Sequence, residues 1–293
     1  MTTLCELAAK LPDLIGALLD RESKLKRGRF REETLTDIIT ASLAAFAGPS
    51  MVIEYPDEAA TGGDLDLDFW NVASRRHLRL RIQAKRLNAE KNAGKSVAIR
   101  RRAYHELLHV VPSTGAYQFD TLLKSAGMFV PLYMFYNHAS VVRDPYFAGV
   151  SPAVRGINLA FADDIAFELN RKLAAKPKRL HHKRLSHLRP HFFDLAAIFC
   201  APPAAGDDVP SPDSVYSSIR EMWLKPARDS EQDAAVAQYL RRIFQHQTLS
   251  VVRDGQRRPA DGPAIRFNPE VERATITFIS GRTDDDRTPK ISD

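Results

Sequence analysis

Two alternating segments, close together in the chain, limit most strongly what this sequence can fold into. Residues 64–70 (DLDLDFW) place apolar side chains at every second position, with Asp64, Asp66 and Asp68 between them. Residues 77–85 (HLRLRIQAK) alternate in the same way. Alternation with a period of two is the pattern of a half-buried β-strand. Since only six residues connect the segments, we predict two strands joined as an antiparallel hairpin.

Further periodic patterns flank this hairpin. Apolar residues at helical spacing predict helices, and short runs rich in β-branched and aromatic residues predict strands. The predicted helices cover residues 4–19, 32–47, 97–111, 118–126, 157–175 and about 234–244. The predicted further strands include 51–55, 130–136 and 274–279. The order between residues 32 and 136 is therefore α-β-β-β-α-β, which indicates an α/β fold with a mixed central sheet of about four strands flanked by helices.

Positive charge is distributed unevenly along the chain. The sequence holds 42 Lys and Arg against 36 Asp and Glu, but residues 75–102 contain eleven basic residues with one acid, and residues 171–191 contain eight with none. Such local basic fields suit a phosphate backbone, because each neutralised phosphate releases counterions. A solvated basic face is the alternative interpretation. The candidate nucleic-acid-binding residues are Arg79, Arg81, Arg86, Lys91, Lys95, Arg100, Arg101, Arg102, Lys178, Arg179, Lys183 and Arg184.

The predicted hairpin brings together side chains that suit phosphodiester hydrolysis. Asp64 begins the first strand, and Gln83 and Lys85 share one face of the second. Glu32 and Glu33, on the preceding helix, can approach from another side. Mg²⁺ prefers hard oxygen ligands such as carboxylates, and it lowers the pKa of bound water. A lysine nearby can orient that water or stabilise the charged transition state.

These residues resemble the PD-(D/E)XK nuclease superfamily in its Q-x-K form, which is familiar from Mrr-like restriction endonucleases and some antiviral effector nucleases. The resemblance rests on Asp64, on Gln83-Ala84-Lys85 nineteen positions later, and on the α-β-β-β-α-β order. It covers about residues 30–140. A bacterial family of Q-x-K proteins is similar over the runs EETLTD (32–37), TGGDLDLDFW (61–70), QAKRL (83–87), YQFDTLLKSAG (117–127) and VPLYMFYN (130–137).

The resemblance implies a restriction-endonuclease-like core and an endonuclease that uses Mg²⁺ or Mn²⁺ to cut double-stranded DNA, in defence against foreign DNA. Asp64 would be the metal-binding acid, and Gln83 would be the second metal ligand through its carbonyl oxygen. Lys85 would be the catalytic lysine. Glu33, or its neighbour Glu32, would be the helix acid that binds the metal directly or through water. Because double-strand cutters of this superfamily are commonly dimers, a homodimer or a defence-system partner is a further expectation.

Two departures from the superfamily pattern leave an alternative open. Gly63 stands where the superfamily's name has a proline, and Gln83 replaces an acid, which removes one negative charge from the site. A catalytically inactive protein that binds nucleic acid or an effector partner is therefore the alternative function. Asp66 lies on the same predicted face as Asp64 and is the alternative metal ligand. Each of these aspartates also fits the solvent face of an edge hairpin.

Two other patterns indicate metal chemistry. His105-Glu106-Leu107-Leu108-His109 matches HExxH, which on a helix would place two histidines on one face as zinc ligands and make Glu106 the base of a zinc peptidase. Four histidines also lie in the basic segment KPKRLHHKRLSHLRPH, at positions 181, 182, 187 and 191. The dense Lys and Arg around them oppose a cation site, so we expect this segment to bind phosphate.

The domain organisation and compartment follow from composition. The chain of 293 residues is 44% hydrophobic and 27% charged, which excludes wholesale disorder. We predict a nuclease-like domain over residues 1–200, a linker and helix over 201–233, and a small C-terminal extension with a disordered tail over 234–293. Cys5 and Cys200 do not indicate a disulfide framework. With no long apolar stretch and no signal peptide, we expect a soluble, cytoplasmic protein.

Overall fold

The two alternating segments form an antiparallel hairpin of β2 (Asp64–Asn71) and β3 (Arg76–Arg86), as predicted. In this hairpin Asp64 lies opposite Gln83, and Asn71 lies opposite Arg76. The computed structural model describes residues 3–22, 25, 29–45, 50–54, 64–88, 91–92, 95–96, 98–112, 115–175, 181–203, 206–224, 234–244 and 273–281. For residues 64, 91, 92, 95, 96 and 181, this description covers the backbone alone.

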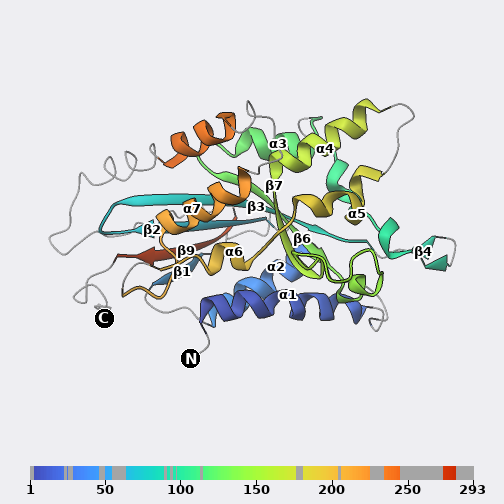
Figure 1. The fold of residues 1–293 in the computed structure, drawn as a ribbon, viewed down its shortest axis with the longest axis horizontal. Helices are drawn as coiled ribbons and strands as arrows, with labels where there is room; N and C mark the ends of the chain where they lie inside the picture. Colours follow the sequence, from blue (N-terminus) through green and yellow to red (C-terminus); the bar gives the residue numbers. More distant parts are fainter. Residues whose placement is uncertain are drawn as a thin grey trace.

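The hairpin is the middle of a seven-stranded mixed sheet with the strand order β1-β9-β2-β3-β6-β7-β8 (Figure 1). β6 runs parallel to β3 and β9 runs parallel to β2, while the other neighbours are antiparallel. β4 and β5 form a separate two-stranded sheet. The remaining strand bounds are β1 Met51–Glu54, β4 Lys91–Asn92, β5 Lys95–Ser96, β6 Val130–Asn137, β7 Gly156–Phe161, β8 Phe193–Asp194 and β9 Ala274–Ser280.

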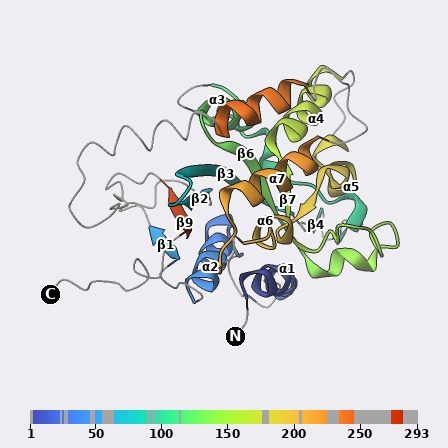
Figure 2. The same ribbon diagram turned by 60° about the vertical axis from the view of Figure 1, so that its left-hand side comes forward.

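Helices cover both faces of the sheet and bury a separate apolar cluster on each. Figures 1 and 2 show α1 (Leu4–Asp20) and α2 (Glu32–Ala44) on one side, and α3 (Gln118–Ser125) and α4 (Ala162–Ala174) on the opposite side. The cluster on the first side also takes in residues of α6 (Ala196–Phe199), α7 (Pro212–Trp223) and the helix at 234–244. The cluster on the second side takes in α5 (Leu185–Leu188). No helix within the described ranges is both long and apolar enough to cross a membrane.

The predicted helix over 97–111 is wrong. The segment contains two short 3-10 helices, η2 (Ile99–Arg101) and η3 (His105–Leu108), which are separated by extended backbone. Tertiary contacts override the local preference here: the backbone of Ala103 accepts from Asn88, and the N–H of Tyr104 donates to Lys183. The buried Tyr104 hydroxyl also donates to the Asn137 side chain at 2.5 Å. A regular helix would break these contacts with neighbouring segments.

The predicted helix over 157–175 divides into β7 and α4. β7 is buried at every position and pairs with β6 and β8. A short apolar run of this kind is compatible with either a buried strand or a buried helix, so its periodicity cannot decide. The true helix start is marked by Asp163 and Asp164 in the first turn of α4, because acidic side chains interact favourably with the positive end of a helix dipole.

The C-terminal strand belongs to the central sheet and is not an appendage to it. β9 lies between β1 and β2, and Ile276 and Phe278 of this strand are fully buried. Figures 1 and 2 show β9 in red beside β2. In the described residues, the predicted C-terminal extension therefore completes the fold of the N-terminal part. The predicted disordered tail lies outside the described residues, as does 225–233 of the predicted linker.

A disulfide joins the two cysteines, contrary to the interpretation of the sequence. Cys5 at the start of α1 is bonded to Cys200, the residue that follows α6, with a Cα–Cα distance of 4.6 Å. The sequence separation of 195 residues gives no sign of this pairing. The packing of α1 against α6 brings the two sulfur atoms together, and spacing alone could not reveal that contact.

Candidate functional site

A ladder of cross-strand pairs leads along the hairpin to the predicted site. The Asp66 carboxylate accepts two hydrogen bonds from Arg81, at 2.9 and 3.1 Å, and Asp68 pairs with Arg79 at 3.3 Å. Asp66 is therefore already neutralised by its neighbour, which argues against its role as the alternative metal ligand. Asp64 is the next position in the ladder, directly opposite the uncharged Gln83. Its side chain lies outside the described part of the structure.

Gln83 carries a buried acceptor without a hydrogen-bond partner among the described residues. The residue is only 5% exposed, and the acceptor is its Oε1 atom. A buried acceptor without a partner costs about 1–3 kcal/mol, so such atoms call for an explanation. A bound cation is one, because an amide carbonyl oxygen is a normal ligand for hard metal ions.

Lys85 and Glu32 meet at the same end of β3. The Lys85 Nζ atom is 3.4 Å from Oε2 of Glu32, and the lysine side chain is buried. Beyond Gln83 the described part of β2 no longer pairs with β3, and the other Glu32 oxygen accepts the backbone N–H of Arg86 at 2.8 Å. Glu32 therefore contacts both the edge of β3 and the Lys85 side chain. These contacts hold in place the lysine that follows Gln83 by two residues on the same face of the strand.

Of the two candidate helix acids, Glu32 and not Glu33 lies beside Lys85. Glu32 is the first residue of α2 and is partly buried, whereas Glu33 is exposed to solvent. The first turn of the helix is held in place by Thr36, whose hydroxyl is 2.8 Å from that of the buried Tyr136 on β6. This contact sets the rotation of α2 and directs Glu32 toward β3. Sequence periodicity alone does not fix that rotation at a helix end.

The surroundings of Glu32 at the edge of β3 do not fully compensate its negative charge. Burial raises the pKa of Glu32 above its ordinary value, although Lys85 and the N–H of Arg86 lower it. The carboxylate of Glu106 raises this pKa further, so Glu106 belongs to the surroundings of the site. Nothing in the sequence pattern indicates this role for Glu106. A cation bound near Glu32 would stabilise its ionised form.

Several predicted nucleic-acid contacts are used inside the molecule. Arg79 and Arg81 pair with aspartates of β2 and lie over the Phe129 ring at 5.1 and 4.0 Å. Arg86 is buried and forms an ion pair with Glu22. Arg86 is therefore committed to the fold. Arg79 and Arg81 also stabilise the hairpin, although 38% of the Arg79 side chain and 17% of the Arg81 side chain stay exposed.

Other predicted basic residues gather on the surface. Arg100, Arg101 and Arg184 line a polar hollow of about 360 Å³ together with Tyr146 and Ser186. Hydrogen bonds between Ser186 and the Arg100 carbonyl, and between Leu185 and Arg102, bring the two basic stretches together here. The side chains of Lys91 and Lys95, and the residues Lys178 and Arg179, lie outside the described part. The hollow is a suitable size and charge for a phosphate group.

The two remaining basic candidates face inward. Lys183 donates to the backbone carbonyl of His105 at 2.9 Å, and burial lowers its pKa. Burial also lowers the pKa of Arg102, and its partial burial leaves it less accessible than Arg100 and Arg101.

The HExxH segment lacks the helix that a zinc peptidase requires. η3 ends at Leu108, and His109 has extended backbone with φ −64° and ψ 135°. His105 and His109 therefore do not lie one turn apart on a helix face, and both are exposed. The zinc-peptidase hypothesis loses its structural basis at this segment.

Comparison with known proteins identifies the chain at the level of a family. No curated protein matches it, and no solved structure matches it. Residues 4–285 match a family of unknown function, DUF6615. This match spans both the N-terminal helices and the C-terminal strand β9, so it covers the fold as a unit. On this evidence the chain belongs to the DUF6615 family.

Proposed function

We propose that this protein is a metal-dependent nuclease that hydrolyses phosphodiester bonds of DNA. The observation that carries the proposal is the buried Oε1 atom of Gln83, which has no hydrogen-bond partner among the described residues. It lies two residues from a buried Lys85 that contacts Glu32. Acid, amide carbonyl and lysine are the groups that such hydrolysis requires. A buried amide oxygen without a partner calls for an explanation, and a bound metal ion supplies one.

The order of the elements supports the same proposal. α2, β1, β2, β3, α3 and β6 follow one another in the α-β-β-β-α-β order of the superfamily that the sequence resembles, with β4, β5 and 3-10 turns between β3 and α3. β6 is parallel to β3, and β3 carries the Q-x-K residues in the middle of the sheet. The insertion of β9 between β1 and β2 is a departure from a simple four-stranded core.

The residues present fit a Mg²⁺ or Mn²⁺ ion. Asp64, Gln83 and Glu32 would hold the ion through two carboxylates and one amide oxygen, which is the chemistry that these hard cations prefer. When bound, such an ion lowers the pKa of a water molecule and offsets charge on the phosphate.

The residues of this chain have separable roles in the proposed reaction. Lys85 would donate a hydrogen bond to the phosphate or to the attacking water. Glu32 holds the lysine at 3.4 Å and therefore positions it. Arg100, Arg101 and Arg184, in the basic hollow, would bind the phosphate backbone away from the cleavage site.

The test is cleavage of supercoiled plasmid DNA by the purified protein with Mg²⁺ or Mn²⁺. We expect cleavage that stops with chelator and that falls by at least about 100-fold in Lys85→Ala and Asp64→Ala, because each removes a group acting in the reaction. Glu32→Gln and Glu33→Gln are a matched pair, since they remove neighbouring carboxyl groups from one helical turn. We expect loss of activity in the first and retention in the second.

Two outcomes would reject the assignment. Equal cleavage by the parent, Lys85→Ala and Asp64→Ala would show that the site lies elsewhere. Salt-dependent DNA binding without cleavage under any divalent metal would instead support the catalytically inactive alternative. Circular dichroism of each variant distinguishes lost chemistry from lost folding.

A further inference from the structure

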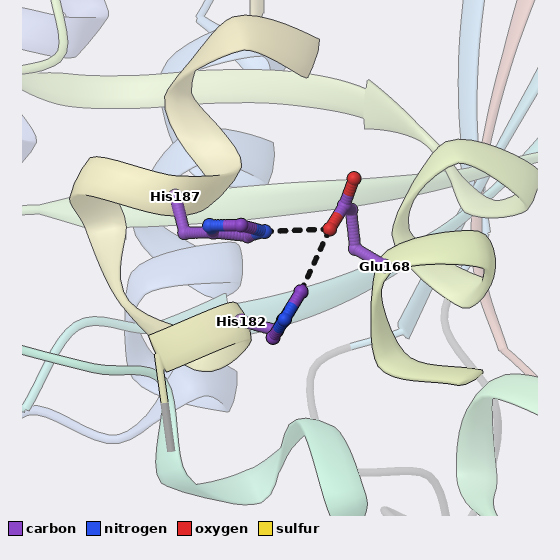
Figure 3. A group of neighbouring side chains, drawn as sticks. All are labelled: Glu168, His182 and His187. Carbon is purple, nitrogen blue, oxygen red and sulfur yellow. Dashed lines mark hydrogen bonds and ion pairs between the residues drawn. The ribbon is translucent and has the colours of Figure 1, made fainter. Parts of the chain in front are cut away.

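A second group of metal-ligating side chains lies on the opposite side of the sheet from α2. Glu168, in the middle of α4, contacts two histidines of the following segment (Figure 3). Its Oε2 atom is 2.8 Å from Nδ1 of His182 and 2.5 Å from Nε2 of His187. The three ligand atoms lie within 4.8 Å of one another. The histidines therefore face a buried carboxylate, and do not form the exposed phosphate-binding strip that the sequence predicts.

A third histidine approaches the same carboxylate. Nε2 of His191 is 3.7 Å from Oε1 of Glu168, and its other ring nitrogen is 3.8 Å from Asp164. Histidines that bind zinc usually use one ring nitrogen for the metal and hydrogen-bond a carboxylate with the other. His191 is positioned for this arrangement, with Asp164 beside one nitrogen and Glu168 beside the other. Residues 182, 187 and 191 have the spacing H-x4-H-x3-H, which lies within the range of zinc ligands.

The charges around this cluster are mixed, because Arg171 forms an ion pair with Oε1 of Glu168 at 3.2 Å while the three histidines lie near the same carboxylate. The Oε2 atom of Glu168, which faces His182 and His187, takes no part in that ion pair.

We propose that Glu168, His182, His187 and His191 form a zinc-binding site. Glu168, His182 and His187 place three ligand atoms within 4.8 Å of one another, and His191, whose Nε2 atom lies 3.7 Å from the other Glu168 oxygen, would complete a set of four. Neutral imidazole favours Zn²⁺ over Mg²⁺. Zinc–ligand distances of about 2.0–2.2 Å in a tetrahedron separate neighbouring ligand atoms by about 3.3 Å. His182 and His187 would move away from Glu168 by less than about 1 Å on that basis. The ion replaces protons that the imidazoles donate to Glu168, and these protons pass to the other ring nitrogens or to solvent.

The site would fasten the basic segment to the domain. Glu168 comes from α4, whereas the histidines come from η5 (His181–Lys183), α5 and η6 (Arg189–His191). Arg184 and Ser186, which line the arginine hollow, lie between His182 and His187. A zinc ion here therefore fixes one wall of that hollow. This inference is independent of the proposed nuclease site, because the two share no residue.

Metal content and affinity test the proposal directly. Protein purified without a histidine tag is stripped with chelator and titrated with Zn²⁺ alone, in competition with a chromogenic chelator. We expect one zinc per chain, a higher melting temperature with Zn²⁺, and a visible Co²⁺ spectrum typical of tetrahedral coordination. Excess Mg²⁺ should not displace the zinc.

Ligand variants then locate the ion. We expect His187→Ala and Glu168→Gln to weaken zinc affinity by at least about 100-fold, and Asp164→Asn to weaken it by about 10- to 100-fold through His191. The matched control is His105→Ala combined with His109→Ala, which removes two exposed histidines from the other candidate motif and should leave zinc affinity unchanged.

The results separate the possibilities even where a variant does not fold. Absence of stoichiometric zinc binding by the parent protein overturns the proposal and leaves a hydrogen-bond network without metal. Zinc binding that persists in both His187→Ala and Glu168→Gln also overturns it. If His187→Ala is unfolded by circular dichroism, His182→Gln replaces it in the same titration. Because the readout is metal binding, failure of DNA cleavage has no bearing on the result.

Discussion

The protonation state of the Glu32 carboxyl group should make the activity of the proposed site depend on pH. Its pKa is raised by burial, so as the pH falls Glu32 takes up a proton earlier than an ordinary glutamate. Protonation removes both the charge that holds Lys85 and a metal ligand. We therefore predict that, at sub-saturating Mg²⁺, where the proton and the metal compete for this carboxylate, cleavage falls on the acid side at a pH above the ordinary range of a glutamate, as a pH–rate profile would show.

Glu32 should make the stability of the fold depend on pH in the opposite direction to activity, so that it destabilises the protein as the pH rises. For a carboxyl group with a raised pKa in the folded protein, the stabilising contribution is complete below the unfolded-state pKa and is lost as the pH rises through the folded-state pKa. The neutral Glu32→Gln variant avoids that loss. We expect its free energy of unfolding, relative to the parent, to increase from pH 4 to pH 8 in urea titrations.

The same residue pair supplies the comparison for this prediction. Glu33→Gln removes a carboxyl group from the same helical turn, but from an exposed position. If both variants changed with pH by the same amount relative to the parent, the effect would come from net charge and not from the buried carboxyl of Glu32.

At the scale of elements, the contact between α1 and β7 depends on a single glycine. Gly156 begins β7 with φ +72°, and a Cβ atom at this position would overlap the backbone of Pro12 in α1. We predict that Gly156→Ala lowers the free energy of unfolding by about 2–5 kcal/mol, from the left-handed conformation and from forced separation of the two elements. Urea denaturation followed by circular dichroism measures the change.

Gly149 provides a control with the same backbone conformation. Its φ is +67°, and a Cβ atom there would meet nothing within 4 Å. Gly149→Ala should therefore cost only the conformational part, about 1–2 kcal/mol. If both variants lost the same free energy of unfolding, the close contact between α1 and β7 at Gly156 would be contradicted.

Sequence patterns predict the elements in which buried and exposed side chains alternate with a regular period. The hairpin of 64–71 and 76–86 is an example, because its alternation follows directly from burial of one face. The 3-10 segment around Tyr104 and the strand at 156–161 were not predictable, since hydrogen bonds to distant residues select their conformation. Local pattern holds no information about such partners.

The residues of the candidate site likewise fall into those that the sequence predicts and those that depend on tertiary contacts. Gln83 and Lys85 were placed together because residues two apart on a strand share a face. The choice of Glu32 over Glu33 depends on the rotation of α2, which the contact between Thr36 and Tyr136 sets across 100 positions of sequence. Glu106, which interacts electrostatically with Glu32, lies in a short 3-10 helix where the sequence pattern predicts an α-helix.

At the scale of the whole molecule, the disulfide ties the first helix to the late part of the chain. Cys5 and Cys200 enclose a loop of 195 residues, and the chain-entropy model gives such a loop a stabilisation of about 5 kcal/mol. We predict that reduction lowers the melting temperature and that the native protein shows no reactive thiol. A reductant should have no effect on the double variant Cys5→Ser, Cys200→Ser. Two free thiols in the native, unreduced protein would contradict the pairing.

The distribution of charge over the folded molecule indicates which basic residues would contact DNA if the proposed function is correct. Arg79, Arg81 and Arg86 are held by carboxylates, whereas Arg100, Arg101 and Arg184 line the surface hollow where the two basic stretches meet. Affinity for nucleic acid should therefore depend on the second group. Each phosphate contact contributes about 0.9 to the slope of log affinity against log salt concentration.

We predict that replacing Arg100, Arg101 and Arg184 together by Ala weakens binding of a short fluorescent DNA duplex and makes the salt slope shallower by up to about 3. Fluorescence anisotropy in chelator, which prevents cleavage, measures both quantities. The control removes the same charge from exposed positions elsewhere, at Arg155, Arg220 and Arg241. If both triple variants lost affinity equally, net charge alone would account for binding, and the hollow would have no special part in holding the duplex.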